Sequence, residues 1–189
     1  MNIFAIDSDP YQAAEWMVDK HVVKMILESS QLLCTAHRLL DGVQYVDKTK
    51  TGRNVKRWRL ADPQDDMILY SATHINHPSA VWCRETSGNY EWLYRHFQAL
   101  CLEYTHRYGK YHKCQGMLWD HLSMTPRNIK QAPLQPFAVA MDKQYIVSTD
   151  PIVNYRNYYK IGKARMHKWT KREAPPWLQE PSDLFTVNM

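Results

Sequence analysis

Three Asp-Pro pairs divide this chain into helical segments and constrain its fold more than any other feature. They are Asp9-Pro10, Asp62-Pro63 and Asp150-Pro151. An aspartate before a helix accepts hydrogen bonds from the free N–H groups of the first turn, and a proline suits that turn because its missing N–H has no partner to lose. We therefore expect a helix to begin at each pair.

The first pair leads into residues 10–40, where apolar residues recur with the helical period. We expect a short helix and then a longer one that ends before Asp41-Gly42, with the glycine as a left-handed cap. The second pair predicts a helix over about 63–72. The third predicts a helix over about 151–170.

The middle of the chain contains one more long helical pattern. Residues 78–108 predict a helical segment that is broken around Ser87-Gly88 and ended by Gly109. Residues 111–149 contain three prolines and little periodicity. They predict a long connection with one short helix around 115–122.

The length of 189 residues suits one well-buried core, and no repeat or low-complexity linker divides the chain. We predict a compact single domain over 1–189, mainly α-helical, with long irregular connections. A basic insertion at about 43–60 has room for one small β-hairpin. An irregular tail is expected at about 173–189.

The charge of the chain favours an acidic partner. Lys and Arg number 24 against 19 Asp and Glu, a formal net charge of +5, and the insertion alone holds six basic residues between Lys48 and Arg59. Nucleic acid is the expected partner of such a chain. Seven Trp and twelve Tyr supply rings with a polar edge, which suit base stacking as well as packing.

Several classes of protein are not indicated. Cys34, Cys83, Cys101 and Cys114 lack CxxC spacing and predict reduced core thiols. No apolar run is long enough for a membrane span, and the start lacks the features of a signal peptide, so we expect a cytoplasmic protein. No phosphate-binding glycine loop or nucleophile elbow is present, and we expect no cofactor.

A polar stripe runs along the first long helix. At 100° per residue, His21, Lys24, Glu28 and Gln31 fall in one narrow arc. Opposite them lies an apolar set: Val22, Val23, Ile26, Leu33 and Cys34. The stripe fits the lining of a site, and it equally fits an ordinary solvated helix face.

The N-terminus is apolar from its third residue, since Ile3, Phe4 and Ile6 follow Met1 almost at once. A packed terminus or an edge strand would explain this pattern. The pattern would also hold the terminal amine in place. Because an α-amine is much less basic than a lysine, more of it is a neutral nucleophile near pH 7. An anchored amine near Glu28 would form a chemical site.

Three blocks of the chain resemble the pyrimidine-dimer DNA glycosylases of the phage endonuclease V type. The first is Asp19-x-His21 with Val22, Val23 and Glu28. The second is Tyr90-Glu91-Trp92-Leu93, continued by Leu100, Glu103, Arg107 and Gly109, and the third runs from Asn154 to Ala164. They follow the family's order and cover somewhat under half of the chain.

The resemblance implies an all-α enzyme that flips a nucleotide and attacks the sugar C1′ with its N-terminal amine. The imine formed then permits strand cleavage by β-elimination, so an AP lyase activity is also implied. Carried over, Glu28 assists proton transfer, His21 is the catalytic helix histidine and Lys24 contacts phosphate. Asn2 departs from the family, which has threonine after a removed methionine. The bulky Asn2 should retain Met1, whose amine would be the nucleophile unless the lyase chemistry is absent.

Other polar residues are candidates for contacts with nucleic acid, and each also fits ordinary surface or packing roles. The candidates are Gln31, His77, Arg84, Asn89, Arg107, Arg156, Tyr159, Lys160 and Lys163. His74, His77, His112 and Cys114 raise a metal alternative, but their spacing is not that of a zinc module. A helix-start cap or a phosphate contact is the preferred interpretation of this cluster.

The sequence thus predicts a DNA glycosylase that acts on a damaged or modified pyrimidine in double-stranded DNA. Two alternatives stay open: a glycosidase acting on free nucleosides or nucleotides, and a non-catalytic nucleic-acid-binding protein. The oligomeric state does not follow from the sequence.

Overall fold

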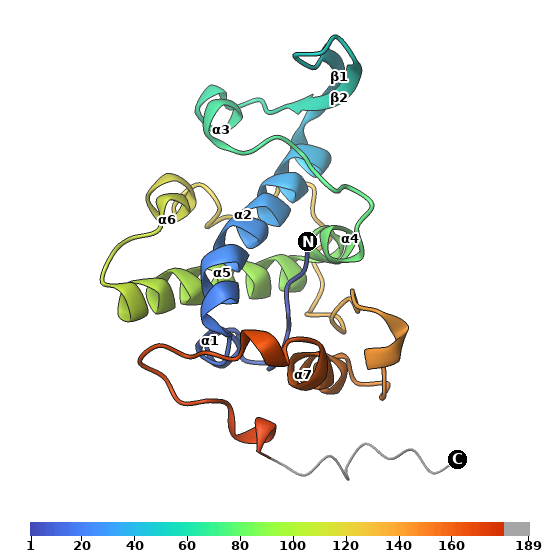
Figure 1. The fold of residues 1–189 in the computed structure, drawn as a ribbon. Coiled ribbons are helices and arrows are strands. Elements are labelled where there is room, and N and C mark those ends of the chain that lie inside the picture. The colour runs from blue at the N-terminus through green and yellow to red at the C-terminus, as the bar shows by residue number, and fades with distance from the viewer. Residues whose placement is uncertain (180–189) are drawn as a thin grey trace.

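The protein is mainly α-helical with one small β-hairpin, as predicted. The structure, a computed structural model, describes residues 1–179 (Figure 1). The helices of this region are α1 (Pro10–Glu15), α2 (Asp19–Asp41), α3 (Pro63–Ile68), α4 (Pro78–Glu85), α5 (Ser87–Tyr108), α6 (Lys113–Leu118) and α7 (Pro151–Gly162). The strands β1 (Val43–Lys48) and β2 (Asn54–Arg59) form the antiparallel hairpin in the basic insertion.

Short 3-10 turns lie at Lys143–Tyr145, Ala164–Met166 and Pro176–Leu178. Most of the remaining described chain is irregular, including the long connection between α6 and α7. The predicted irregular tail at about 173–189 extends beyond the described residues, since 180–189 lie outside them.

All three Asp-Pro pairs begin helices, which confirms the predicted starts. The carboxylate of Asp9 accepts hydrogen bonds from the N–H groups of Tyr11 and Gln12. Asp62 and Asp150 cap α3 and α7 in the same way. In each helix the proline occupies the first turn, as its fixed φ and missing N–H favour.

Two glycines behave differently from each other. Gly109 ends α5 in the left-handed region with a φ of 67°, as predicted. Gly42 ends α2 in an extended conformation with a φ of −88°, so the predicted left-handed cap is wrong. Glycine is required there for space, because a Cβ at Gly42 would lie 2.9 Å from the Cβ of Trp58.

Three helices differ in length from the prediction. α3 stops at Ile68, α6 spans Lys113–Leu118, and α7 stops at Gly162 where residues up to 170 were expected. Beyond α7 the chain crosses to the start of α2, where the N–H of Asp19 donates to the carbonyl of Lys168. Tertiary hydrogen bonds therefore replace the helical ones that local periodicity favoured.

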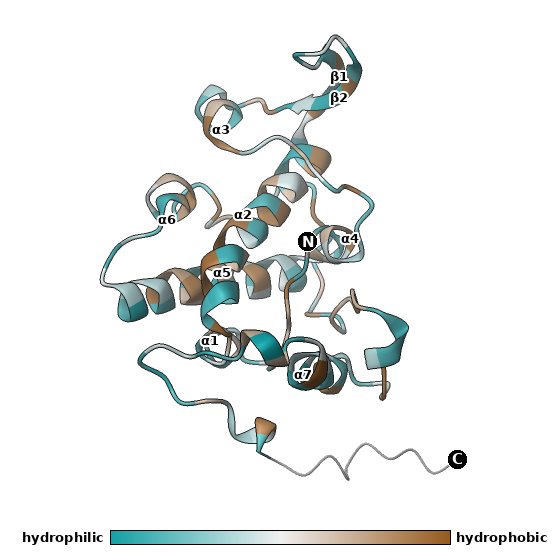
Figure 2. Ribbon diagram, in the orientation of Figure 1, coloured by the Kyte–Doolittle hydropathy of each residue, from teal (hydrophilic) through white to brown (hydrophobic). Residues whose placement is uncertain are grey.

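The core forms where α2 and α5 cross (Figure 1). Apolar stretches recur along both helices at this crossing, as Figure 2 shows. α1 and α4 pack against the same pair. Several elements cover α2, and as a result even the polar residues Ser29 and Ser30 are buried. Val23 and Leu27 lie on the part of the helix that stays partly exposed. Val23, a member of the apolar set opposite the polar stripe, therefore does not belong to the core.

Arg107 lies at the centre of a buried ion network, so its predicted contact with nucleic acid is corrected. Its side chain has no exposed surface and donates to Asp19 at 2.9 Å and to Glu103 at 2.7 Å. It also donates to the carbonyl oxygens of Met17 and Glu15. The network joins α1 and α2 to α5.

We expect Arg107→Gln to destabilise the fold by about 3–5 kcal/mol, because it removes a fully buried cation from Asp19 and Glu103 and leaves Glu103 with Arg172 alone. The measurement is the free energy of unfolding from urea titration. The matched control is Arg95→Gln, an exposed arginine on the same helix, which should change it by less than about 0.5 kcal/mol. Equal stability of the two variants would contradict the structural role of Arg107.

Candidate functional site

The N-terminal segment is held against Glu28 of α2. The backbone N–H of Asn2 donates to Oε2 of Glu28 at 2.9 Å. Nζ of Lys24 lies 3.0 Å from Oε1 of the same carboxylate. Glu28 is 9% exposed, whereas the side chain of Lys24 is 66% exposed. A buried carboxylate is therefore shared between the start of the chain and a cation at the surface.

The side chain of Asn2 fixes the course of this segment. Its Oδ1 accepts hydrogen bonds from the N–H groups of Ile3 and Phe4, and its Nδ2 donates to the carbonyl of Ala140 at 2.7 Å. Phe4 has a φ of 48°, which is costly for a large side chain. These bonds hold the first residues in a defined bend beside α2.

His77 responds to the charges of both the terminal amine and Glu28. Burial lowers the pKa of His77, and the positive charge of the chain's amino terminus lowers it further, while the charge of Glu28 opposes the shift. Its Nδ1 accepts a hydrogen bond from the N–H of Ser79 at the start of α4. The charges of the terminal amine and of Glu28 thus both act on His77, the residue that caps α4, and we treat the three as the candidate group. In Figure 1 the N-terminus lies near α4 and α2.

His21 has a supporting role, which corrects the expectation that it is a catalytic residue. It is 4% exposed, its Nδ1 bonds to the hydroxyl of Tyr159, and its ring stacks on Phe4 with centroids 4.2 Å apart. Burial, followed by the charges of Lys163 and Lys24, lowers its pKa to about 3. A ring that stays neutral at pH 7 and is packed on both sides positions Phe4.

Four of the predicted nucleic-acid contacts lie where they could reach a ligand at this group. Lys24 and His77 belong to it directly, and Gln31 is half-buried one helical turn from Glu28. Nζ of Lys163 lies 4.5 Å from the ring centroid of Tyr158 and 5.7 Å from that of Phe4.

Arg84 and Lys160 are placed less directly. Arg84 lies on α4 seven residues after His77, and its buried Nη1 has no hydrogen-bond partner in the described structure. Lys160 is half-buried on α7.

The other predicted contacts are structural, and their assignment is corrected. Asn89 is fully buried, donates to the carbonyl of Trp82 and accepts from the N–H of Gln135. Tyr159 is fully buried against His21. Arg156 donates to the carbonyl of Ile6 and to Asp7, and so anchors the N-terminal segment. Helical spacing placed these residues on α5 and α7 but could not say which neighbours cover them.

Sequence reasoning missed the anchoring role of Asn2, which it treated only as a departure from a family pattern. Its one local signal is a polar residue directly before an apolar run. That signal does not identify Ala140 or Glu28 as its partners, because they lie 138 and 26 residues away.

A metal centre has no support among residues 1–179, where no three His, Cys, Asp or Glu side chains are grouped to hold an ion. His77 and His112 cap α4 and α6, which confirms the expected helix caps. All four cysteines are buried and have free thiols, as predicted.

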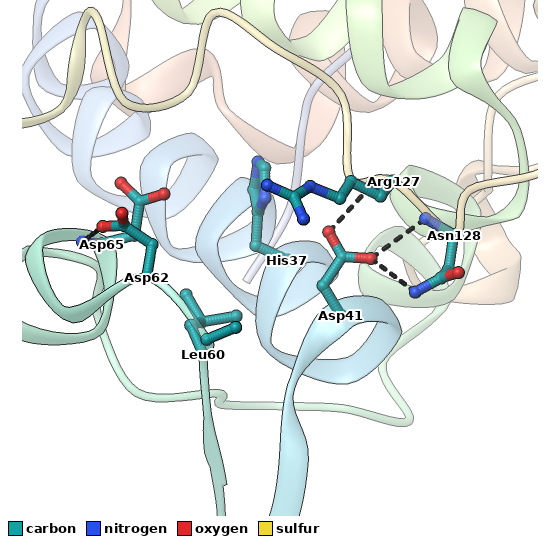
Figure 3. Close-up of a pocket in the computed structure, with 8 residues that line it drawn as sticks. His37, Asp41, Leu60, Asp62, Asp65, Arg127 and Asn128 are labelled. Carbon is teal, nitrogen blue, oxygen red and sulfur yellow. Dashed lines mark hydrogen bonds between the residues drawn. The ribbon is translucent and has the colours of Figure 1, made fainter.

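A separate polar pocket of about 180 Å³ lies at the C-terminal end of α2 (Figure 3). Several of its polar groups are engaged in hydrogen bonds, either within the lining or with residues behind it. Asp41 accepts hydrogen bonds from the backbone N–H groups of Arg127 and Asn128, and Nε2 of His37 bonds to the hydroxyl of Tyr90. Asp65 bonds to His121. These contacts tie the loop after α6 to α2.

Comparison of the chain with protein-family models, with curated proteins and with solved structures gives no match. Within the described residues, no helix has the length and apolar character needed to cross a membrane.

The depressed pKa of His21 predicts a pH-dependent stability. In the unfolded chain His21 is protonated below about pH 6.5, whereas in the folded protein it is protonated only near pH 3. Stability is therefore full above pH 6.5 and falls as the pH drops, by about 1.4 kcal/mol per pH unit for this group. His21→Gln should make the slope between pH 6 and 4 shallower by about one proton.

The measurement is urea unfolding at each pH. His106→Gln, a change at an exposed histidine of α5, should retain the wild-type slope. An unchanged slope in His21→Gln would mean that His21 is charged in the folded protein.

Proposed function

We propose that this protein is a DNA glycosylase that excises a damaged or modified pyrimidine, with the N-terminal amine as nucleophile and Glu28 as its proton-handling partner. One observation carries the proposal. The backbone nitrogen of residue 2 lies 2.9 Å from the buried carboxylate of Glu28, so the amine of Met1 is one residue from that contact. An amine beside a buried carboxylate is an arrangement suited to imine chemistry.

The chemistry uses groups that the chain itself supplies. The neutral amine attacks the sugar C1′, the bond from C1′ to the base breaks, and the base leaves with a proton. Opening of the sugar ring with loss of a second amine proton gives an imine, and removal of a C2′ proton then expels the 3′ phosphate. Glu28 is placed to transfer these protons and to stabilise the positive charge that develops.

The surroundings of the amine suit this role. Burial, followed by the charge of the amine, lowers the pKa of His77, which favours the neutral form of its ring. Lys24 and Lys163 supply two cations around the N-terminal segment, which can contact phosphates. The resemblance to pyrimidine-dimer glycosylases, at Glu28 and the first long helix, supports the same assignment.

Within this proposal the nucleophile is either the amine of Met1 or, if Met1 is removed, the amine of Asn2. With Met1 present, the Asn2 nitrogen is an amide and the attacking group is the Met1 amine, one residue from the Glu28 hydrogen bond. Removal of Met1 would leave the Asn2 amine directly on Glu28. Intact mass of the purified protein distinguishes the two starting chains.

We expect Glu28→Gln to lower base release by about 10²–10⁴-fold, the usual contribution of a general acid or base. The glutamine oxygen can still accept the N–H of Asn2, so folding and DNA affinity should change little. The measurement is single-turnover base release from duplexes that carry defined pyrimidine lesions. Glu91→Gln, an exposed carboxylate of α5, is the matched control. Wild-type turnover by Glu28→Gln would remove Glu28 from the mechanism.

Blocking the terminal amine tests the nucleophile. Borohydride reduces an imine to a stable secondary amine, so wild-type protein should form a covalent adduct with lesion DNA that maps to residue 1 or 2 by tandem mass spectrometry. Acetylation of the amine, or an uncleaved tag, should abolish trapping while DNA affinity is retained. An adduct on a lysine side chain would overturn the assignment. DNA binding without trapping or base release would favour a non-catalytic binding protein, and activity on mononucleotides alone would favour a nucleoside glycosidase.

A further inference from the structure

The β1–β2 hairpin stands apart from the helical body, beyond the C-terminal end of α2 (Figure 1). The two strands pair in a regular antiparallel register, from Val43 opposite Arg59 to Lys48 opposite Asn54. All six residues of β1 are exposed, and no residue of β2 is buried. An isolated two-stranded ribbon is only marginally stable in water. A hairpin exposed on both faces therefore contributes little to the core.

The hairpin carries the net charge of the whole protein. Residues 43–59 contain six Lys and Arg and one Asp, a net charge of +5, which equals the formal charge of all 189 residues. The rest of the chain has eighteen basic and eighteen acidic residues and is neutral. The basic character that suggested nucleic acid therefore belongs to this one element.

The basic side chains of the hairpin are not neutralised by the fold. Within residues 1–179, none of them has a carboxylate at ion-pair distance. They are Lys48, Lys50, Arg53, Lys56, Arg57 and Arg59. The guanidinium of Arg59 lies over the ring of Tyr45, 5.0 Å from its centroid. The hydrogen bond from Leu60, the pairing with Arg38 and the charge of Arg59 together lower the pKa of Asp66, so Arg59 also acts on a carboxylate beyond ion-pair distance.

The base of the hairpin is fixed to the helical body. The buried side chain of Arg38 on α2 donates to the carbonyls of Trp58 and Leu69 and pairs with Asp66. Asp66 in turn accepts the N–H of Leu60, the residue after β2. The close approach of Gly42 to Trp58 holds the other strand at the same point. The hairpin therefore projects in a defined direction.

We propose that this hairpin is a second DNA-binding element, which enters the major groove of duplex DNA outside the reaction site. A two-stranded ribbon fits that groove, and strands of six residues are about 20 Å long. Apolar and basic residues mix on both faces, because Val43 and Tyr45 face the same way as Arg57 and Arg59, and Val46 the same way as Lys56. Neither face is apolar enough to enter a membrane, whereas both present cations to phosphates.

The inference rests on the proposed function for its DNA partner but not for its chemistry. Glu28 and Asp41 are separated by thirteen residues of α2, about 20 Å along the helix axis. If one duplex contacts both Glu28 and the hairpin, the hairpin would touch the DNA about half a helical turn or more away from the flipped nucleotide. Binding to undamaged duplex, where no base is released, therefore tests the hairpin separately from the amine.

The experiment uses a quadruple variant with Lys48, Lys50, Arg53 and Lys56 changed to Gln. All four side chains are exposed, so the fold should be retained. The control changes the same residue types at exposed positions elsewhere, namely Arg95, Lys110, Lys113 and Lys130. The measurement is the affinity for an undamaged duplex of about 25 base pairs, a length that covers two helical turns. It is repeated at salt concentrations between about 50 and 200 mM.

The hairpin variant should bind at least about tenfold more weakly at 100 mM salt, and its log-log salt slope should fall by about 0.9 for each lost phosphate contact. The control should keep most of the affinity and slope. If the proposed function holds, both variants should still form the borohydride-trapped adduct at saturating DNA. If the wild-type protein forms no such adduct, the proposed function is rejected, while the affinities measured for the hairpin variant still test the hairpin.

Four outcomes would overturn the inference. An equal loss in the two quadruple variants would mean that only total charge matters. Unchanged affinity and slope in the hairpin variant would place the DNA elsewhere. A larger loss on single strands than on duplex, or loss of binding to phosphatidylserine vesicles with DNA binding intact, would assign the hairpin to a different partner.

Discussion

Polar and charged groups that α2 removes from water must find partners, and each pairing fixes a different part of the molecule. Asp19 forms an ion pair with Arg107 of α5, and His21 forms a hydrogen bond with Tyr159 of α7. Glu28 accepts a hydrogen bond from the N–H of Asn2. Near its other end, Arg38 holds the base of the hairpin. The helix therefore works as an axis from which the N-terminus, the core and the hairpin are all positioned.

The candidate site depends on this arrangement at the level of Glu28. Burial of the carboxylate is tolerated because Lys24 and the Asn2 N–H occupy its two oxygens. The same bonds bring the start of the chain to the carboxylate, and Asn2 and Phe4 then shape the bend that leads away from it. The pairing that stabilises a buried charge is thus also the one that would set a nucleophile beside a proton carrier.

Charge is distributed in two unlike ways along this axis. Near the N-terminus, isolated cations such as Lys24 and Lys163 accompany a carboxylate and aromatic rings. Beyond the other end of α2, the hairpin gathers all of the net charge with a single acidic residue. The first pattern suits a site that handles individual atoms of a substrate, and the second suits phosphate contacts over a longer surface.

The sequence by itself determined the features that local chemistry decides. Asp-Pro pairs began three helices and Gly109 ended one, because caps and φ angles involve residues within a few positions of one another. The arc of Glu28 and Lys24 also followed from helical spacing. Only the tertiary structure decided that Asn2 meets Glu28, that Arg107 and Asn89 are buried, and that α7 ends at Gly162. Those outcomes depend on partners tens of residues away, and the free energy of pairing a buried polar group outweighs the local preference that the sequence displays.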